Sequence, residues 1–212
     1  MNYLHNEGGK QKSVDVSAEE ISKKVIGVLA LQGAFREHIK AIRKAGANAV
    51  EIKFPDDMKV LDGLIVPGGE STTISKLIEK YKFKEYLDDF YMSGKPMFGT
   101  CAGMILFARE IKDENFGLGY INIKVERNSY GRQIDSFHEF VELSFDKTKK
   151  FEAIFIRAPR VISIGPEVDI LSKINNNVIL ARQKNVLVSS FHPELQEDMR
   201  IHGYFLKMVL NK

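Results

Sequence analysis

The sequence predicts an α/β domain in which a mostly parallel central sheet carries an antiparallel extension and helices cover both faces. In the first half of the chain, short apolar runs alternate with amphipathic stretches, which is typical of parallel strands joined by helices. In the second half, short strand-like runs follow one another across turns, which favours antiparallel pairing. With 212 residues, of which 44% are hydrophobic, the chain can bury the core of one such domain.

The first strand is expected at Val25–Leu31 (VIGVLAL), because a nearly continuous apolar run is typical of a strand covered on both faces. It ends at Gln32-Gly33, and the apolar residues of 34–46 then share one face of a helix. The other elements of this half are strands at Ala49–Phe54, Leu61–Val66 and Pro96–Thr100, helices over 71–81 and 83–94, and a helix that starts at Ala102.

The second half is expected to hold short strands and one closing helix. The ranges are Ile121–Glu126, Phe140–Phe145, Phe151–Ile156, Val161–Ile164, Val178–Ala181 and Val186–Ser190 for the strands and 198–212 for the helix. Asparagine-containing turns at 175–177 and 184–185 separate the last of these strands.

Residues 1–24 are expected to form an N-terminal extension, partly flexible, ahead of a single domain that spans 25–212. The extension contains a Gly8-Gly9 pair, few large apolar side chains and equal numbers of acidic and basic residues. Ser17, with Glu20 three positions later, could cap a short helix. No catalytic element is expected in this segment.

The composition argues against several functional classes. A single cysteine can form neither an internal disulfide nor a cysteine-based zinc site, which favours a reducing compartment. The net charge of +3 comes from 31 basic and 28 acidic residues mixed along the chain, whereas nucleic-acid binding favours a basic stripe. No apolar run approaches the length of a membrane span, and the first residues lack the apolar core of a secretory signal. We therefore expect a cytoplasmic protein that binds neither nucleic acid nor membrane and uses no metal or cofactor.

The strongest local motif is GTCAG at 99–103, which has the G-x-S-x-G pattern of a nucleophile elbow with cysteine in the serine position. An apolar strand precedes the motif and an apolar helix follows it. Cys101 would therefore lie on a strained turn at a helix N-terminus, whose dipole favours a thiolate. A lone cysteine is more often a small buried hydrophobic residue, but the glycines on both sides favour a nucleophile.

A thiol nucleophile requires a base, and the base requires an orienting partner. His192 follows a predicted strand, and in an extended segment its side chain would share a face with that of Glu194. Because the carboxyl ends of parallel strands meet at one edge of a sheet, His192 and Cys101 are expected near each other. The alternative is a His-Pro turn with Glu194 in water. The other histidines are expected in the extension, at the surface or at the edge of the core: His5, His38, His138 and His202.

The loop at 67–72 (PGGEST) connects a predicted strand to a predicted helix. Its glycines could cradle a phosphate, but no Lys-Ser/Thr pair follows as in a P-loop, and Glu70 would bring negative charge to that place. The dinucleotide motif G-x-G-x-x-G is also absent after the first strand. A glycine loop with free N–H groups instead suits a small polar substrate and the oxyanion of an acyl transfer.

With these motifs, the sequence resembles the class I (triad) glutamine amidotransferases, which have a three-layer, flavodoxin-like α/β fold. Among them it is similar to the glutaminase subunits of pyridoxal 5′-phosphate synthases, from about Val25 to the C-terminus. The resemblance rests on the blocks GVLALQG (27–33), PGGESTT (67–73), GTCAG (99–103), ERNSYGRQIDSF (126–137), FIRAP (155–159) and SFHPEL (190–195). The extension at 1–24 departs from the family pattern.

The resemblance implies that Cys101 is the nucleophile, His192 the general base and acid, and Glu194 the residue that orients His192. It implies contacts with L-glutamine at Gly69, Glu70, Ser71, Arg127, Ile156 and Arg157, and oxyanion donors at the backbone N–H groups of Gly69 and Ala102. Without the resemblance, each of the two arginines would be interpreted as part of a surface ion pair.

The resemblance also implies that the chain hydrolyses L-glutamine to L-glutamate and ammonia. It implies a partner synthase, a (β/α)₈ barrel that combines the ammonia with ribose 5-phosphate and glyceraldehyde 3-phosphate, in an assembly of twelve glutaminases on twelve synthase subunits. The Gln32-Gly33 turn is expected near that interface.

Two other interpretations are a glutaminase subunit of another amidotransferase and a non-enzymatic α/β domain in which Cys101 senses redox state. The RNSYGRQ and FIRAP blocks argue against the first, and the His-x-Glu pair argues against the second.

Overall fold

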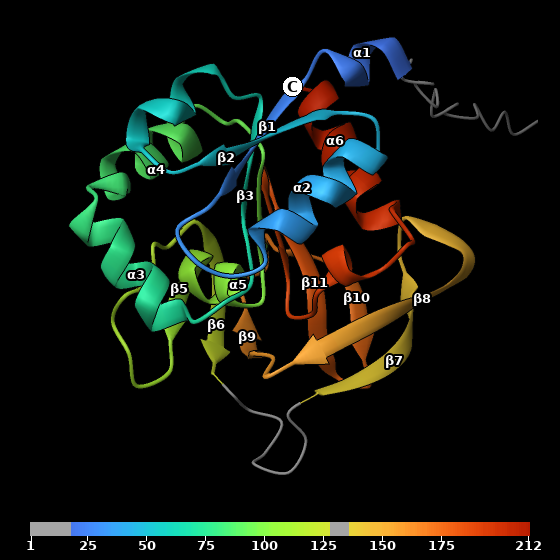
Figure 1. Ribbon diagram of the computed structural model, residues 1–212. Coiled ribbons are helices and arrows are strands. Elements are labelled where there is room, and N and C mark those ends of the chain that lie inside the picture. Colours follow the sequence, from blue (N-terminus) through green and yellow to red (C-terminus); the bar gives the residue numbers. More distant parts are fainter. Residues whose placement is uncertain (1–17, 128–135) are drawn as a thin grey trace, which may run out of the picture.

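A seven-stranded sheet forms the middle layer of the computed structural model, which describes residues 18–127 and 136–212 (Figure 1). In the order in which they lie side by side, its strands are β10 (Asp169–Ile174), β11 (Asn177–Gln183), β12 (Val186–Ser189), β4 (Met97–Thr100), β3 (Gly63–Val66), β1 (Val25–Leu29) and β2 (Asn48–Ile52). The strands from β12 to β2 pair in parallel, and β11 and β10 continue the sheet in antiparallel pairing. The predicted mostly parallel sheet with an antiparallel extension is confirmed.

Helices cover both faces of this sheet. They are α1 (Ala18–Ser22), α2 (Phe35–Lys44), α3 (Ser71–Lys80), α4 (Phe83–Met92), α5 (Ala102–Phe107) and α6 (Arg200–Leu210), with 3-10 helices η1 (Pro55–Val60) and η2 (Pro193–Leu195). Helices α2 and α6 pack on one face, and α3, α4 and α5 pack on the other (Figure 1). Each face buries its own apolar cluster, so the fold has the three layers that the sequence predicts.

Two smaller sheets complete the second half. The first consists of β5 (Ala108–Ile111), β6 (Ile121–Glu126) and β9 (Arg160–Ile164), and the second is a hairpin of β7 (Ser136–Leu143) and β8 (Asp146–Ile156). The hairpin packs through Phe151 and Phe155 into the same apolar cluster as α2 and α6. Most of the RNSYGRQ block lies outside the described residues, as does 1–17 of the extension.

The structure differs from the sequence prediction at two strands. The helix expected to continue beyond Ala102 ends at Phe107, and the next residues form β5, which pairs with β6. Alanine, arginine and glutamate of β5 are good helix formers, so only the tertiary pairing makes this segment a strand. Strand β10 was not expected, because bulges in its pairing with β11 break the alternation of buried and exposed residues. Within the described residues, no helix is long and apolar enough to cross a membrane.

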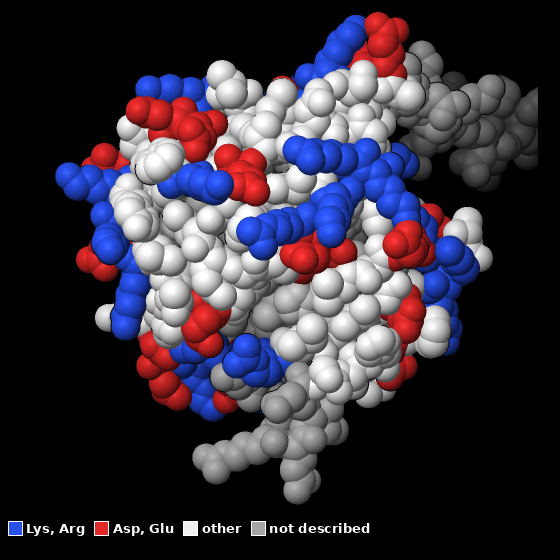
Figure 2. Space-filling view, in the orientation of Figure 1, with Lys and Arg blue, Asp and Glu red and all other residues white. Residues whose placement is uncertain are grey.

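Helix α2 exposes a basic face and buries the opposite one. Its exposed side chains are Arg36, Lys40, Arg43 and Lys44, and Figure 2 shows basic side chains gathered over this helix. The buried face carries apolar side chains and one polar residue, His38, which is 0% exposed. The expectation of a surface or core-edge position for His38 is therefore wrong, and it is wrong for His202 of α6 as well, which is also fully buried.

The carboxyl ends of four parallel strands meet at one edge of the central sheet. These strands are β1, β3, β4 and β12, and they are neighbours in the sheet. The residues that follow them are the Gln32-Gly33 turn, the PGGEST loop, Cys101 and the segment that contains His192. The topology thus brings together motifs that are up to 160 positions apart in the chain, at the edge where open α/β sheets bind their ligands.

Candidate active site

Cys101 lies on the sharp turn between β4 and α5. Its backbone has φ 48° and ψ −100°, a conformation that residues other than glycine rarely adopt. The Cys101 amide donates a hydrogen bond of 2.8 Å to the backbone oxygen of Ser189, at the end of the neighbouring strand. Cys101 is only 6% exposed but lines a cavity at the sheet edge. The turn therefore holds the sulfur above the end of the sheet.

The two glycines of the motif allow the strand, the turn and the helix to pack closely. A Cβ atom at Gly99 would lie 2.6 Å from the backbone of Gly103, and a Cβ atom at Gly103 would collide with the backbone oxygen of Val66 on β3. Any side chain at either position would push α5 away from the sheet. The spacing of the motif is thus explained by the packing that keeps Cys101 in its strained conformation.

His192 and Glu194 form a hydrogen-bonded pair beside Cys101. His192 Nδ1 lies 2.7 Å from Glu194 Oε1, and the His192 amide donates a bond of 2.9 Å to the backbone oxygen of Ile154 on β8. The expected extended geometry is wrong, because Pro193 begins the 3-10 helix η2. The carboxylate therefore reaches the imidazole across a helical turn.

Burial and pairing together determine the charges of this site. Burial alone would lower the pKa of His192, but its hydrogen bonds with Cys101 and Glu194 and the charges of both groups raise that pKa to about 10. The Glu194 carboxyl is fully buried, and the two nearby imidazoles, His38 and His192, hold its pKa below the ordinary value in spite of desolvation. His192 is thus placed to hold a proton between the thiol group and a carboxylate.

The glycine loop packs directly against these residues. A Cβ atom at Gly68 would collide with the His192 ring and lie 3.3 Å from Cys101 Cβ, so only glycine fits there. On the other side of the loop, the amide of Ala34 donates a bond of 2.9 Å to the Gly68 oxygen, and the amide of Glu70 donates one of 2.8 Å to Gln32 Oε1. The turn after β1 therefore supports the loop, a contact that no sequence pattern indicated.

A cavity of about 200 Å³ opens among these elements. It is lined by Gly33, Ala34, Gly68, Gly69, Glu70, Ser71, Cys101, Ile105, Arg127, Ile156, Arg157 and His192. All six residues expected to contact glutamine are in its wall, together with the expected nucleophile and base. Ala34 and Ile105 were not expected there, because nothing in their type or spacing signals a binding role. Glu194 and Ala102 are not among the lining residues.

The two arginines of the cavity differ in their surroundings. Arg127 pairs with Glu70 at 2.9 Å and with Glu114 at 2.8 Å. Arg157 follows Ile156 with φ 43° and is exposed. The Cys101 thiol donates a long hydrogen bond of 3.8 Å to the backbone oxygen of Ile156, so this segment borders the sulfur through its main chain.

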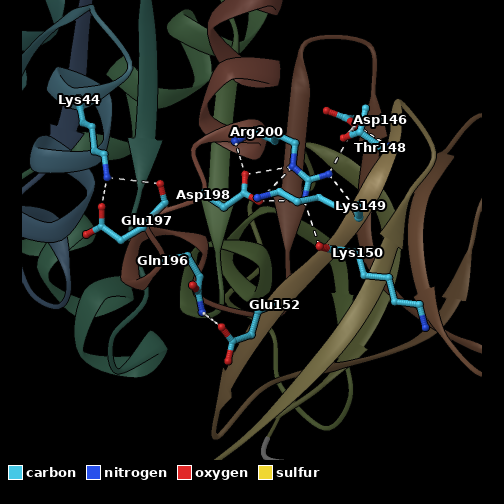
Figure 3. A network of polar contacts seen from close by, with 10 residues as sticks. All are labelled: Lys44, Asp146, Thr148, Lys149, Lys150, Glu152, Gln196, Glu197, Asp198 and Arg200. Carbon is cyan, nitrogen blue, oxygen red and sulfur yellow. Dashed lines mark hydrogen bonds and ion pairs between the residues drawn. The ribbon is translucent and has the colours of Figure 1, made fainter.

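Polar contacts, some exposed and some partly buried, fasten the segment that follows Glu194 to α2 and β8 (Figure 3). We refer to these contacts, made by residues 196–200, as the surface anchor. They are the pairs Lys44–Glu197, Gln196–Glu152 and Arg200–Asp198, and bonds from Arg200 to the backbone oxygens of Lys149 and Lys150. The surface anchor therefore holds the segment on the carboxyl side of the His192–Glu194 pair against α2 and β8.

Fold and site together define an α/β protein with a cysteine elbow beside a His–Glu pair, the arrangement of triad amidotransferases. Residues 28–211 match the SNO glutamine amidotransferase family, and the chain belongs to this family. The resemblance drawn from the sequence is confirmed. Within residues 18–127 and 136–212, no group of three or more His, Cys, Asp or Glu side chains is arranged to hold a metal ion.

The chain is similar to curated proteins named pyridoxal 5′-phosphate synthase subunit PdxT. The one from Fervidobacterium nodosum is 53% identical over 188 residues, which cover 87% of this chain and 97% of that protein. The one from Thermosipho africanus is 50% identical over 188 residues, which cover 87% and 98%.

Solved structures agree with this assignment. One described as a glutamine amidotransferase has a TM-score of 0.82 and 44% identity, and the match covers 87% of this chain and 98% of that chain. A structure of PurLQS from Thermotoga maritima shares the fold alone, with a TM-score of 0.68, 16% identity and coverage of 89% and 98%.

Proposed function

We propose that this chain is the glutaminase subunit of a pyridoxal 5′-phosphate synthase, and that it hydrolyses L-glutamine with Cys101, His192 and Glu194. The observation that carries the proposal is the strained Cys101 beside His192, whose ring is hydrogen-bonded to Glu194, at the wall of a cavity of about 200 Å³. The names of the relatives at about half identity support the choice of synthase.

In the first step, the Cys101 thiolate attacks the side-chain carboxamide carbon of glutamine. The bond between this carbon and nitrogen then breaks, and His192 donates its proton so that ammonia leaves. A glutamyl thioester remains on Cys101. Glu194 keeps the imidazole in the orientation that this transfer requires, through its contact with Nδ1 at 2.7 Å.

The negative charge of the tetrahedral intermediate is held by the backbone N–H groups of Gly69 and Ala102. The amides on either side of Gly69 already have acceptors, since Gly68 donates to Thr100 Oγ1 at 3.0 Å and Glu70 to Gln32 Oε1 at 2.8 Å. The Gly69 amide is the one that this arrangement leaves for a substrate. One such donor lowers the barrier by about 3 kcal/mol.

In the second step, His192 accepts a proton from water, and the resulting hydroxide attacks the thioester. Glutamate leaves, and Cys101 returns to the thiolate. A histidine held between a sulfur and a carboxylate can serve in both steps, because it gains in the second the proton that it lost in the first.

The remaining wall residues bind the amino-acid end of glutamine. Arg127 suits the α-carboxylate, since a planar guanidinium binds carboxylates through paired hydrogen bonds, and Glu70 suits the α-ammonium group. The two side chains are paired at 2.9 Å, so a zwitterion would meet both charges together. Ser71, Ile156 and Arg157 complete the expected contacts.

Ammonia is delivered to a synthase partner. We propose the (β/α)₈ barrel subunit, in an assembly of twelve glutaminases on twelve synthase subunits, which uses the ammonia with ribose 5-phosphate and glyceraldehyde 3-phosphate. The proposed location is the cytoplasm. Glutamine hydrolysis, measured with and without the synthase, is expected to be faster with it, and equal turnover in both would contradict this coupling.

The test of the chemistry is glutamate release by two variants in the presence of the synthase. Cys101→Ala and His192→Asn are each expected to lower kcat by about 10³-fold or more. His138→Asn, which changes an exposed histidine paired with Glu152, is the matched control and should keep full turnover. Substantial hydrolysis by either site variant would reject the proposal.

Labelling with 6-diazo-5-oxo-norleucine separates this enzyme from a redox sensor. The proposal expects a covalent adduct on Cys101 that glutamine competes away, detected by mass spectrometry. A sensor cysteine would be oxidised by peroxide without labelling that depends on glutamine.

A further inference from the structure

The buried face of α2 carries His38 into the space behind the His192–Glu194 pair. His38 is 0% exposed, as is His202, which approaches from α6. Burial of a histidine among apolar residues is unfavourable unless its ring nitrogens find partners. Both histidines lie outside the cavity wall and outside the proposed reaction steps, so their burial requires an explanation.

The nitrogens of His38 each have a defined partner. Nε2 is hydrogen-bonded to Thr100 Oγ1 at 2.9 Å, and Nδ1 to His202 Nε2 at 3.2 Å. Nε2 also lies 3.3 Å from Glu194 Oε2, a buried oxygen that has no hydrogen-bond partner among the described residues, so this contact is electrostatic. Thr100 Oγ1 also accepts the amide of Gly68 at 3.0 Å. We refer to His202, His38, Thr100, Glu194 and His192 as the buried histidine chain. It extends from α6 to the cavity.

The charges of the chain follow from its surroundings. Desolvation lowers the pKa of His38, against the attraction of Glu194, and it lowers the pKa of His202 to about 3. Both rings are therefore neutral at physiological pH, while Glu194 is an anion. The titratable groups that act on His38 are Glu194 and His192 of the active-site segment, His202 of α6 and Glu37 of its own helix.

One assignment of protons fits these contacts. A buried anion at Glu194 Oε2 repels the lone pair of an unprotonated nitrogen, so His38 carries its proton on Nε2. This N–H group donates to Thr100 Oγ1 and faces the Glu194 charge at 3.3 Å. His38 Nδ1 is then an acceptor, and it accepts a hydrogen bond from the Nε2–H group of His202. His202 Nδ1 has no hydrogen-bond partner among the described residues, and this assignment leaves it as a bare acceptor rather than a buried N–H group without an acceptor.

We propose that His38 is a positioning residue for glutamine hydrolysis: its neutral ring, with the Nε2–H group facing the second oxygen of Glu194, keeps that carboxylate in place, while His202 fixes the tautomer of His38. This inference rests on the proposed function. Each oxygen of Glu194 then faces one imidazole: Oε1 is hydrogen-bonded to His192, and Oε2 lies 3.3 Å from His38 Nε2, so the His38 dipole opposes rotation of the carboxylate away from His192. His38 Nε2 and the Gly68 amide are both hydrogen-bonded to Thr100 Oγ1, so Thr100 connects the triad with the glycine loop.

The protonation states can be tested without any activity. Nitrogen–proton correlation spectra of the imidazole rings in the isotope-labelled full chain report which nitrogen carries the proton. We expect neutral His38 and neutral His202, both protonated at Nε2. A proton on His38 Nδ1, or a charged His38 at neutral pH, would overturn the proposal.

The functional test compares three variants in the presence of the synthase. His38→Leu removes the polar group that faces Glu194 and is expected to lower kcat by about tenfold, the effect of losing one buried contact with a charged group. Little change in KM is expected, because His38 lies outside the cavity wall. The acid limb of kcat should move to higher pH, since Glu194 without this polar group is easier to protonate. His38→Gln restores an N–H donor, so its kcat should be higher than that of His38→Leu and should recover most of the loss.

Phe98→Leu is the control for packing. The Phe98 ring lies 6.1 Å from the rings of both His38 and His202, so the variant loosens the same region without removing a hydrogen-bonding group. It should lower the melting temperature and leave kcat unchanged.

The outcomes separate the two proposals. If His38→Leu and Phe98→Leu lower stability alike and neither changes kcat or its pH profile, His38 is a packing residue and the inference fails. If wild-type turnover does not depend on Cys101, the proposed function fails, whereas the spectra still decide how His38 is protonated.

Discussion

The buried histidine chain and the surface anchor fasten the same segment of the molecule, and they do so in opposite surroundings. The buried histidine chain includes Glu194, whose side chain is 0% exposed. The surface anchor follows Glu194 in sequence and includes Glu197, whose side chain is 94% exposed (Figure 3). Both sets of contacts join the segment to α2, through His38 in one case and Lys44 in the other.

The surroundings of a polar group, rather than the number of its contacts, decide what that group can do. Away from water, desolvation lowers the pKa of His192, but Cys101 and Glu194 together raise it to about 10. The charge of Glu194 acts on His38 as well. In solvent, ion pairs such as Lys44–Glu197 contribute about 0–1 kcal/mol and are screened by salt. We therefore expect the buried chain to control catalysis and the anchor to contribute only to stability.

The largest expected effect is that of Glu194→Gln on turnover. The neutral amide does not carry the charge that stabilises a protonated imidazole at His192, so kcat should fall by about 10³-fold or more. Glu197→Gln removes a carboxylate from the same segment and should leave kcat unchanged. Comparable losses in both variants, measured as glutamate release, would refute the contrast between buried and exposed groups.

A smaller effect is expected in the pH dependence of stability. The folded chain holds His202 neutral down to a pKa of about 3, but the unfolded chain binds a proton there near the ordinary value of 6.5. As pH falls below 6.5, this group lowers the free energy of unfolding by up to about 1.4 kcal/mol per pH unit. His38 acts in the same direction, because its pKa is also lowered. His192 acts in the opposite direction, since its raised pKa gives stability that is lost as pH rises toward about 10.

His202→Leu should therefore reduce the slope of the free energy of unfolding against pH between pH 6.5 and about pH 4.5. The reduction should correspond to about one fewer proton bound on unfolding. Urea unfolding at several pH values measures the slope. Phe98→Leu, in the same neighbourhood but without a titratable group, should keep the wild-type slope. An unchanged slope in His202→Leu would mean that this imidazole is protonated in the folded chain.

Arg200→Met tests the less exposed part of the anchor. The Arg200 side chain is 15% exposed, pairs with Asp198 and donates to two backbone oxygens of β8. Its loss should lower the free energy of unfolding by about 1–2 kcal/mol, with kcat within about twofold of wild type because the His192–Glu194 pair is untouched. A large loss of kcat at unchanged stability would show that the anchor also positions the site.

The smallest effect is expected for Lys44→Ala. Lys44 pairs with the highly exposed Glu197, so its removal should change the free energy of unfolding by less than about 0.5 kcal/mol. The same measurement in high salt should remove even this difference. A loss above about 1 kcal/mol would contradict the view that this pair is screened by solvent.

Much of the fold could be predicted because its signals are local. The apolar run at the first strand and the periodicity of α2 indicate their structure within a few residues, and both elements are present. Segments with mixed signals failed: β5 consists largely of helix formers, and the strand pairing with β6 overrides that propensity. The sequence also indicated which residues would gather at one edge of the sheet, because the order of strands and motifs follows from the chain.

The chain by itself determined the cysteine elbow, the glycine loop, the His-x-Glu pair and the layered architecture that collects them, since each depends on neighbours in sequence. The tertiary structure alone decided the place of His38 and His202. These histidines are 164 positions apart, and neither has a local pattern that distinguishes it from a surface residue. Their meeting beside Glu194 depends on how α2 and α6 pack on one face of the sheet. Burial there then sets their charge, because a neutral ring is the form that desolvation favours.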